Sequence, residues 1–197
     1  MGAGQHAVQS ASTLTAPLVI TKLTQGYDAL EDRIRMDVRG ARARILRIWL
    51  TQRLGDALFG HLARSVAAQS ASGVDDPGFA RYMQVWEQQA AQSQLRPEKP
   101  VYWQGEAVLI SAADVDRGAS SSKITFKALL AGIEHPVATL SLDETRLRQW
   151  LGVMFSIYRK AGWQAEVWPP WFATAYETTA TGPNRQGPGG ADRGNPV

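Results

Sequence analysis

The sequence predicts an α+β fold with two similar halves, each of three antiparallel strands and a helix, and a further helix between them. Three observations lead to this prediction. Two short segments alternate strictly between polar and apolar residues, which is typical of half-buried strands. Longer segments carry apolar residues at helical spacing. These patterns occur in the same order in both halves, which favours an internal repeat.

The strands of the first half are predicted before residue 50. Residues 17–24 are rich in β-branched side chains, as strands are. Residues 33–39 alternate between arginine or aspartate and apolar side chains, so one face of this strand is buried. Residues 43–49 predict a third strand, with Arg47 and Trp49 on the same face.

Two helices are predicted next. Thr51 can cap the first helix, whose leucines recur every four residues. Asp76 and Pro77 are typical of a helix start, and the second helix is predicted at about 76–95, between the two halves. We expect its apolar stripe to face the core; the stripe consists of Phe79, Met83, Trp86 and Ala90.

The second half repeats the order of the first. An apolar run at 102–113 ends in a predicted polar turn at 114–122. Residues 123–128 alternate like the arginine-rich strand, and 137–142 predict another strand. Residues 141–144 form a capping-box pattern for the final helix. The predicted core residues of both halves include Met36, Ile48, Leu58, Phe126, Leu140, Leu151 and Met154.

Length and composition predict one folded domain with an extension at each end. A chain of 197 residues with 44% hydrophobic residues is normal for such a domain. We expect a flexible leader at 1–16, the α+β domain at 17–172 and a disordered Gly/Pro-rich tail at 173–197. The tail has too few apolar side chains to offset the entropy of ordering. Within the domain, the halves are predicted at about 17–70 and 101–162.

Composition excludes several classes of protein. The chain has no cysteine, which excludes a disulfide scaffold, a thiol nucleophile and a Cys-ligated zinc site. No apolar run approaches the roughly 20 residues that a membrane helix needs. The N-terminus lacks the basic and apolar regions of a secretory signal. We therefore expect a cytoplasmic protein without membrane insertion.

No motif indicates an enzyme. The histidines His6, His61 and His135 are scattered, and their spacing suggests no metal site. The sequence also lacks the glycine patterns of a phosphate-binding loop and of a serine nucleophile. We therefore expect no catalytic residue, no metal and no cofactor. An enzyme whose catalytic residues come together from distant positions stays an alternative.

A basic pair of strands gives the first functional hypothesis. The formal net charge is only +3, but arginines concentrate between residues 33 and 53. Cations interleaved with an aromatic ring suit single-stranded nucleic acid, because guanidinium groups bind phosphates while rings stack on bases. The alternative is a solvated sheet face, as most charged runs are. The predicted binding residues are Arg33, Arg35, Arg39, Arg47, Trp49, Lys123 and Lys127.

Aromatic residues near the C-terminus give a second hypothesis, a protein-interaction or assembly module. Exposed rings there would bind a protein partner or a second copy of the chain. A segment that packs across the body and buries its rings is the favoured interpretation, because aromatic residues commonly stabilise cores. The residues concerned are Trp163, Trp168, Trp171 and Phe172. Both hypotheses describe a non-enzymatic binding protein, for single-stranded nucleic acid or for a protein.

Overall fold

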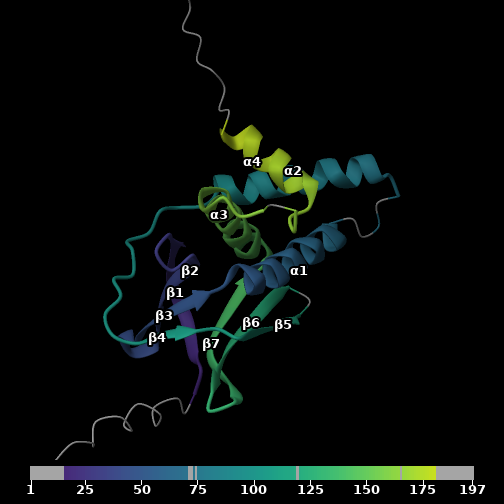
Figure 1. Cartoon of the computed structure of the whole chain (residues 1–197). Coiled ribbons are helices and arrows are strands. Elements are labelled where there is room, and N and C mark those ends of the chain that lie inside the picture. Colours follow the sequence, from purple (N-terminus) through teal and green to yellow (C-terminus); the bar gives the residue numbers. More distant parts are fainter. Residues whose placement is uncertain (1–15, 71–72, 74, 119, 165, 181–197) are drawn as a thin grey trace, which may run out of the picture.

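In the part of the chain that the structure describes, seven strands form one mixed sheet, and four helices pack on it and on one another (Figure 1). The structure is a computed structural model that describes residues 16–70, 73, 75–118, 120–164 and 166–180. The strands are β1 (Leu18–Asp28), β2 (Arg33–Gly40), β3 (Ile45–Leu50), β4 (Ala107–Leu109), β5 (Ala112–Arg117), β6 (Ser121–Leu130) and β7 (Ile133–Asp143). The helices are α1 (Gln52–Ser70), α2 (Pro77–Ser93), α3 (Glu144–Ala161) and α4 (Pro170–Ala180), and a 3₁₀ turn spans Ala41–Ala43.

The strand order is β4-β3-β2-β1-β7-β6-β5. The strands β1–β2–β3 are antiparallel, as are β5–β6–β7, whereas β1 pairs with β7 and β3 pairs with β4 in parallel. The α+β class is therefore confirmed. The sequence did not predict how the two halves join: β1 pairs with β7, which makes them one sheet. The pairing does not confirm the internal repeat, which stays a prediction.

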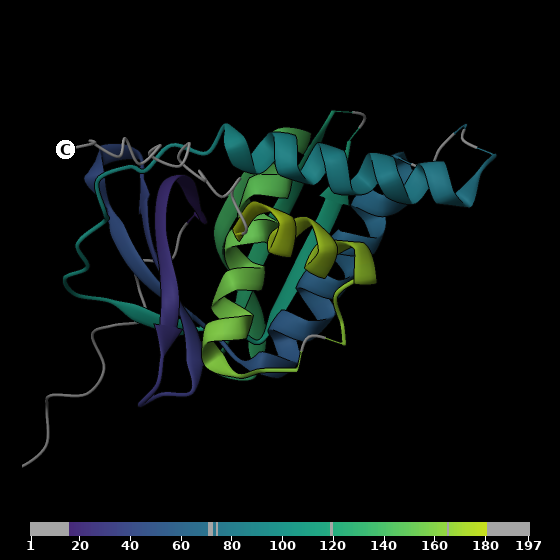
Figure 2. The same ribbon diagram turned by 90° about the horizontal axis from the view of Figure 1, so that it is seen from above.

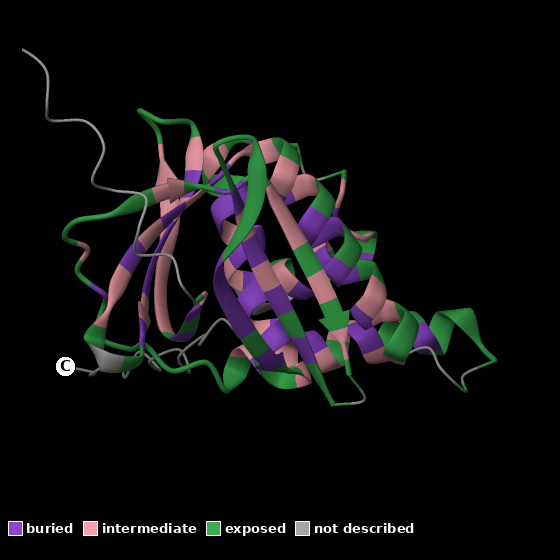
Figure 3. Ribbon diagram, turned by 90° about the horizontal axis from the view of Figure 1, so that it is seen from below, coloured by how far each residue is buried: buried purple, intermediate pink, exposed green. Residues whose placement is uncertain are grey.

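One face of the sheet carries the core, as the alternation predicted. Along β2 and β3, buried residues alternate with partly exposed ones, except that Asp37 is also buried, and the view from below shows the alternation along the strands (Figure 3). α3 contacts β1, β6 and β7, α1 contacts β5, and α2 and α4 pack onto other helices (Figure 2). All seven predicted core residues are buried: Met36, Ile48, Leu58, Phe126, Leu140, Leu151 and Met154.

The predicted starts of α1 and α2 are confirmed. Thr51 and Asp76 accept hydrogen bonds from backbone amides in the first turns of these helices. α3 instead begins after Asp143, whose carboxylate accepts a hydrogen bond of 2.8 Å from the amide of Arg146. The capping box predicted at 141–144 is wrong, because β7 continues through Asp143 before the helix begins.

The polar segment at 114–122, predicted as a turn, forms much of β5 and the start of β6. The apolar run at 102–113 is divided between β4 and the first residues of β5. The turn itself is shorter and lies after β5, where the amide of Gly118 donates to the carbonyl of Ser121 at 2.9 Å. Acidic residues that alternate along an edge strand resist further pairing, which explains the polar character of this strand.

At the C-terminal end, the chain stays helical beyond residue 172, where the sequence placed the domain boundary. Trp171 and Phe172 lie in the first turn of α4 rather than in an extended segment, and Ala175 is buried. Proline is well suited to the first position of a helix, which accounts for the start at Pro170. Residues 1–15 of the predicted leader (1–16) and residues 181–197 of the predicted tail lie outside the described residues.

The helix between the halves is present as α2, but its orientation differs from the prediction. Its buried residues are Ala80, Gln84, Gln88 and Ala91. Phe79 and Trp86, predicted to face the core, are about half exposed, at 51% and 54%. Met83 and Ala90 of the predicted stripe are partly buried, so the stripe lies at the margin of the packed face with its large rings turned outward.

Candidate functional site

The predicted nucleic-acid-binding residues of β2 and β3 lie on the sheet face turned away from the core. Register places Arg35 opposite Trp49 across β2 and β3. In the same way Asp37 lies opposite Arg47. Lys123 and Lys127 alternate with buried residues along β6 and also point away from the core. The alternation thus predicted the face correctly.

Arg47 is held in a cluster of opposite charge and aromatic rings. Its guanidinium donates two hydrogen bonds to the buried carboxylate of Asp37, at 2.7 and 3.0 Å. The Nε atom of Arg35 lies 3.6 Å from the same carboxylate. Two indole rings flank the guanidinium, that of Trp103 at 3.9 Å and that of Trp49 at 5.5 Å. Arg47 therefore already has partners within the chain, and one of them is the ring of Trp49.

The other predicted cations are partly neutralised. Arg33 and Lys127 each pair with a neighbouring carboxylate. Within the described ranges, Arg39 and Lys123 have no carboxylate within 4 Å. Among the described residues of this face, most of the predicted cations therefore pair with carboxylates, and Arg39 and Lys123 do not.

The segment between α2 and β4 crosses this face and covers part of it. The amide of Val101 donates a hydrogen bond of 2.8 Å to the hydroxyl of Thr24 on β1. Val101 is itself buried, and the neighbouring Trp103 contributes the ring that lies on Arg47. Less of the outer sheet face is therefore accessible to a ligand than the sequence predicted.

The aromatic residues near the C-terminus are buried, so the premise that they are exposed is wrong. The ring of Trp168 lies within 6.0 Å of the rings of Phe59, Phe155 and Tyr158. These contacts join the segment after α3 to α1 and α3, which confirms the favoured interpretation that it buries its rings. The buried residues are Trp163, Trp168, Trp171 and Phe172.

A groove opens between β1 and β7, and no feature of the sequence predicted it. The two strands are paired only at Leu18 and Val19 of β1. Immediately afterwards β1 contains a bulge at Thr21. Ile20 pairs with Gly40 of β2 and Lys22 pairs with Arg39, so β1 advances by two residues where β2 advances by one. A bulge bends a strand and increases its twist, which turns β1 away from β7. The two halves of the sheet diverge beyond this point, with α3 between them (Figure 2).

The groove has a volume of about 490 Å³ and an apolar floor. Leu140 of β7 and Trp150 and Val153 of α3 line it, together with β1 residues 20–25. The indole nitrogen of Trp150 donates to the side-chain oxygen of Gln25 at 2.9 Å, which fixes the ring against β1. Because β2 occupies the other side of β1, the edge of β1 that faces the groove has no strand partner beyond Val19 among the described residues.

The rim of the groove is mainly basic. Lys22, Lys99 and Arg146 line it together with one carboxylate, Glu98. Glu98 pairs with Lys22 at 3.2 Å, and Arg146 lies 3.6 Å from Asp143. In the described part of the chain, Lys99 has no carboxylate within 4 Å. Sequence reasoning missed these residues because they come from β1, α3 and the α2–β4 connection, which only the tertiary fold brings together.

No family model, curated protein or solved structure matches the chain. Among the described residues, no three His, Asp or Glu side chains gather where they could hold a metal ion. None of the described helices has both the length and the apolar character needed to cross a membrane. The arrangement that remains as a candidate site is the groove, which offers backbone hydrogen-bonding groups, an apolar floor and a basic rim.

Proposed function

We propose that this chain is a non-enzymatic protein-binding module whose groove between β1 and β7 takes an extended acidic segment of a partner protein. The observation that carries the proposal is the unpaired edge of β1, which borders the groove over residues 20–25. An extended peptide can add to such an edge, because it satisfies the free backbone amides and carbonyls.

The chemistry of the groove supports a particular kind of peptide. Successive side chains of an added strand point to opposite sides, so every second residue would face the apolar floor. The intervening residues would face the rim, where Lys22, Lys99 and Arg146 favour carboxylates. Neither end of the chain has this pattern, because residues 1–15 contain no acidic residue and residues 181–197 contain one.

Fluorescence anisotropy with a labelled peptide of alternating acidic and β-branched residues tests the proposal. We expect saturable binding, and weaker binding of a peptide in which lysine replaces each acidic residue. Lys99→Glu combined with Arg146→Glu should weaken binding about tenfold or more, because both changes reverse charges at the rim. Lys160→Glu, at the far end of α3, is the matched control and should have little effect.

Amide hydrogen exchange separates strand addition from adsorption to the basic rim. Strand addition should slow exchange in residues 20–25 of β1, because backbone amides there gain partners. The edge strand β5 should show no such change. Absence of peptide binding, or binding that leaves exchange in β1 unchanged, would contradict the proposal.

Binding of single-stranded nucleic acid is a second candidate, favoured by the unpaired cations on the outer sheet face. Arg39 and Lys123 supply these charges, and Arg33 and Arg35 share the face. A labelled oligonucleotide should then bind with an affinity that falls steeply with salt, because phosphate contacts release counterions. Replacing the three β2 arginines with alanine should weaken binding and flatten the salt dependence. Equal binding by this variant and the original chain would contradict this candidate.

The finer description of the fold, two copies of one strand–strand–strand–helix unit, is also a proposal. It is supported by the order of elements, which is β1–β2–β3–α1 in one half and β5–β6–β7–α3 in the other. The parallel β1–β7 pairing would relate such copies by a shift along the sheet. Superposition of Leu18–Ser70 on Ala112–Ala161 tests it, and different helix placement would contradict it.

A further inference from the structure

α2 presents its apolar residues to the outside. Phe79, Tyr82 and Trp86 recur at intervals of three and four residues, so they form one stripe, and each is more than half exposed. The opposite face contains Gln84 and Gln88, which are buried. This is the reverse of a surface helix, whose apolar stripe normally packs against the core.

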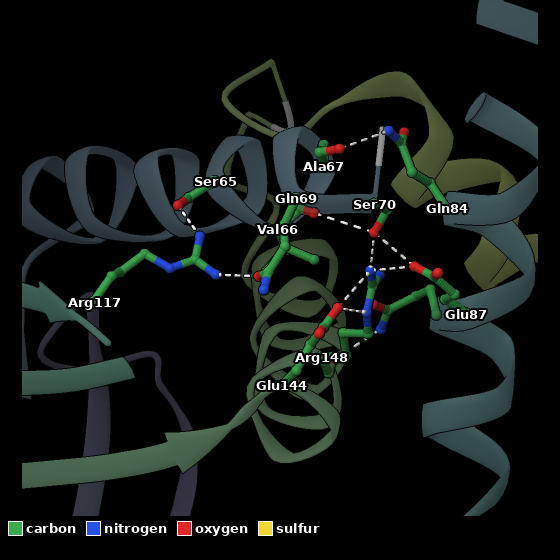
Figure 4. Close-up of polar contacts among 11 residues, drawn as sticks. Ser65, Val66, Ala67, Gln69, Ser70, Gln84, Glu87, Arg117, Glu144 and Arg148 are labelled. Carbon is green, nitrogen blue, oxygen red and sulfur yellow. Dashed lines mark hydrogen bonds and ion pairs between the residues drawn. The ribbon is translucent and has the colours of Figure 1, made fainter. Parts of the chain in front are cut away.

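Specific hydrogen bonds hold α2 in this orientation (Figure 4). The side-chain amide of Gln84 donates to the carbonyl of Ala67 on α1 at 3.0 Å. The amide of Gln88 donates to the carbonyl of Arg148 on α3 at 2.8 Å. Glu87 pairs with the buried guanidinium of Arg148. Turning α2 about its axis to bury its rings would leave these buried polar groups without partners, which is costly.

The guanidinium of Arg148 is the centre of this packing. It contacts Glu87 of α2, Ser70 of α1 and Glu144 of α3, as the close-up shows (Figure 4). The side chain of Arg148 is only 3% exposed, so its charge needs these partners. The outward direction of the aromatic stripe therefore follows from the polar contacts on the other side of α2.

We propose that the stripe is the surface through which two copies of this chain associate, with their α2 helices packed antiparallel. A twofold pair in which the ends of the two helices meet brings Trp86 of one copy against Trp86 of the other, because Trp86 lies midway between Asp75 and Arg96. This surface is separate from the groove between β1 and β7, and the inference does not rest on the peptide-binding proposal.

Charges at the two ends of α2 favour the antiparallel direction. Asp75 and Asp76 precede the helix, and Arg96 follows it. An antiparallel pair places the acidic end of one helix beside the basic end of the other, whereas a parallel pair would bring like charges together. The helix dipoles are also oppositely directed in an antiparallel pair.

The ends of the same chain cannot replace a second copy. Residues 181–197 contain no apolar side chain larger than proline except Val197. Residues 1–15 contain Met1, Val8 and Leu14 and no aromatic residue. Neither segment offers the apolar surface needed to cover three aromatic rings, whereas a second α2 does.

Sedimentation velocity of the full chain, from low micromolar concentration to about 200 µM, tests the proposal. We expect a monomer–dimer equilibrium that moves toward dimer as concentration rises. Trp86→Ser should raise the dimer dissociation constant about 30-fold or more, as loss of a central aromatic contact does. Tyr102→Ser is the matched control, because this residue is 74% exposed on the α2–β4 connection, and its removal should leave the equilibrium unchanged.

Exchanging the end charges tests the direction of the helices. Asp75→Arg and Arg96→Asp should each weaken the dimer, because each places like charges together across the antiparallel pair. The two changes in one chain should restore association, since they recreate the opposite-charge contact in reverse. Circular dichroism of each variant verifies that it is folded. A chain that stays monomeric at the highest concentration, equal effects of Tyr102→Ser and Trp86→Ser, or failure of the double variant to recover would overturn the proposal.

Discussion

Helices α2 and α3 have similar apolar stripes and use them in opposite ways. In α3, Leu147, Leu151 and Met154 are buried between the sheet and the other helices. In α2, the stripe that includes Phe79 and Trp86 faces outward. Periodicity therefore shows that each helix has an apolar face, but the direction of that face depends on the surface that each helix meets.

The polar face of α2 explains why its apolar stripe points outward. α2 has uncharged amides at intervals of four residues, Gln84, Gln88 and Gln92, and these can be buried when they find carbonyl partners. The surface that α2 meets offers such carbonyls from α1 and α3. A glutamine-rich face is thus the signal in the sequence that could have indicated the orientation of α2.

The largest expected effect is the difference in the free energy of unfolding between a truncation in the stripe of α3 and one in the stripe of α2. Leu151→Ala should lower the free energy of unfolding by about 2–5 kcal/mol, because it leaves a cavity in a fully buried site. Phe79→Ala in α2 should change it by no more than about 0.5 kcal/mol at concentrations where the chain is monomeric. Urea denaturation of both variants checks this. Similar losses in both would show that α2 buries its stripe.

The ion pairs of Arg148 beneath α2 should contribute more to the free energy of unfolding than an ion pair on the surface. Arg148→Met should cost about 1–3 kcal/mol, since it removes the cation that pairs with the carboxylates of Glu87 and Glu144. Arg146→Met is the control, because Arg146 is 71% exposed and pairs with Asp143 in water, where such a pair contributes about 0–1 kcal/mol. Equal effects in thermal denaturation would contradict the role given to Arg148.

The smallest expected effect concerns the attachment of the segment after α3 to the β1–β2 turn. Asp32 accepts hydrogen bonds from the hydroxyl of Tyr27 at 2.7 Å and the indole of Trp163 at 3.1 Å. These bonds lower the pKa of Asp32 below its usual value, the bond from Tyr27 having the largest effect. Because the pKa is lowered in the folded state, the stabilisation is present above the unfolded pKa of about 4 and is lost as pH falls through the lowered value.

Asp32→Asn tests this linkage. Asparagine tolerates the positive φ of 48° at this position, so the backbone is preserved while the charge is removed. The variant should be slightly less stable than the original chain at neutral pH, and the difference should disappear in strong acid. A stability difference that is constant with pH would contradict the assignment.

Strands and helices with clear periodicity could be predicted from the sequence. The alternation at 33–39 gave both the strand and its buried face, and Gly162 ends α3 in the left-handed conformation, with φ of 71°. The pairing of β1 with β7 could not be predicted, because its partners Leu18 and Ala138 lie far apart in the sequence. Local pattern contains no information about which distant strand completes a sheet.

The candidate sites were predicted less well, for a related reason. The sequence showed which face carries the arginines, but the pairing of Arg47 with Asp37 depends on the register of β2 and β3. The groove depends on a bulge at Thr21 and on a connection that comes from far along the chain. Both are properties of long-range packing, which composition and periodicity do not specify.

Selective oxidation of tryptophan distinguishes an outward-facing stripe on α2 from a buried one, because Trp86 and Trp150 report on α2 and α3 in one molecule. At low micromolar concentration, limited N-bromosuccinimide followed by peptide mass spectrometry should modify Trp86 much faster than Trp150, which is only 5% exposed. At about 200 µM, association should slow the oxidation of Trp86 and leave that of Trp103 unchanged. Oxidation of Trp86 as slow as that of Trp150 at the lower concentration would contradict an outward-facing stripe on α2.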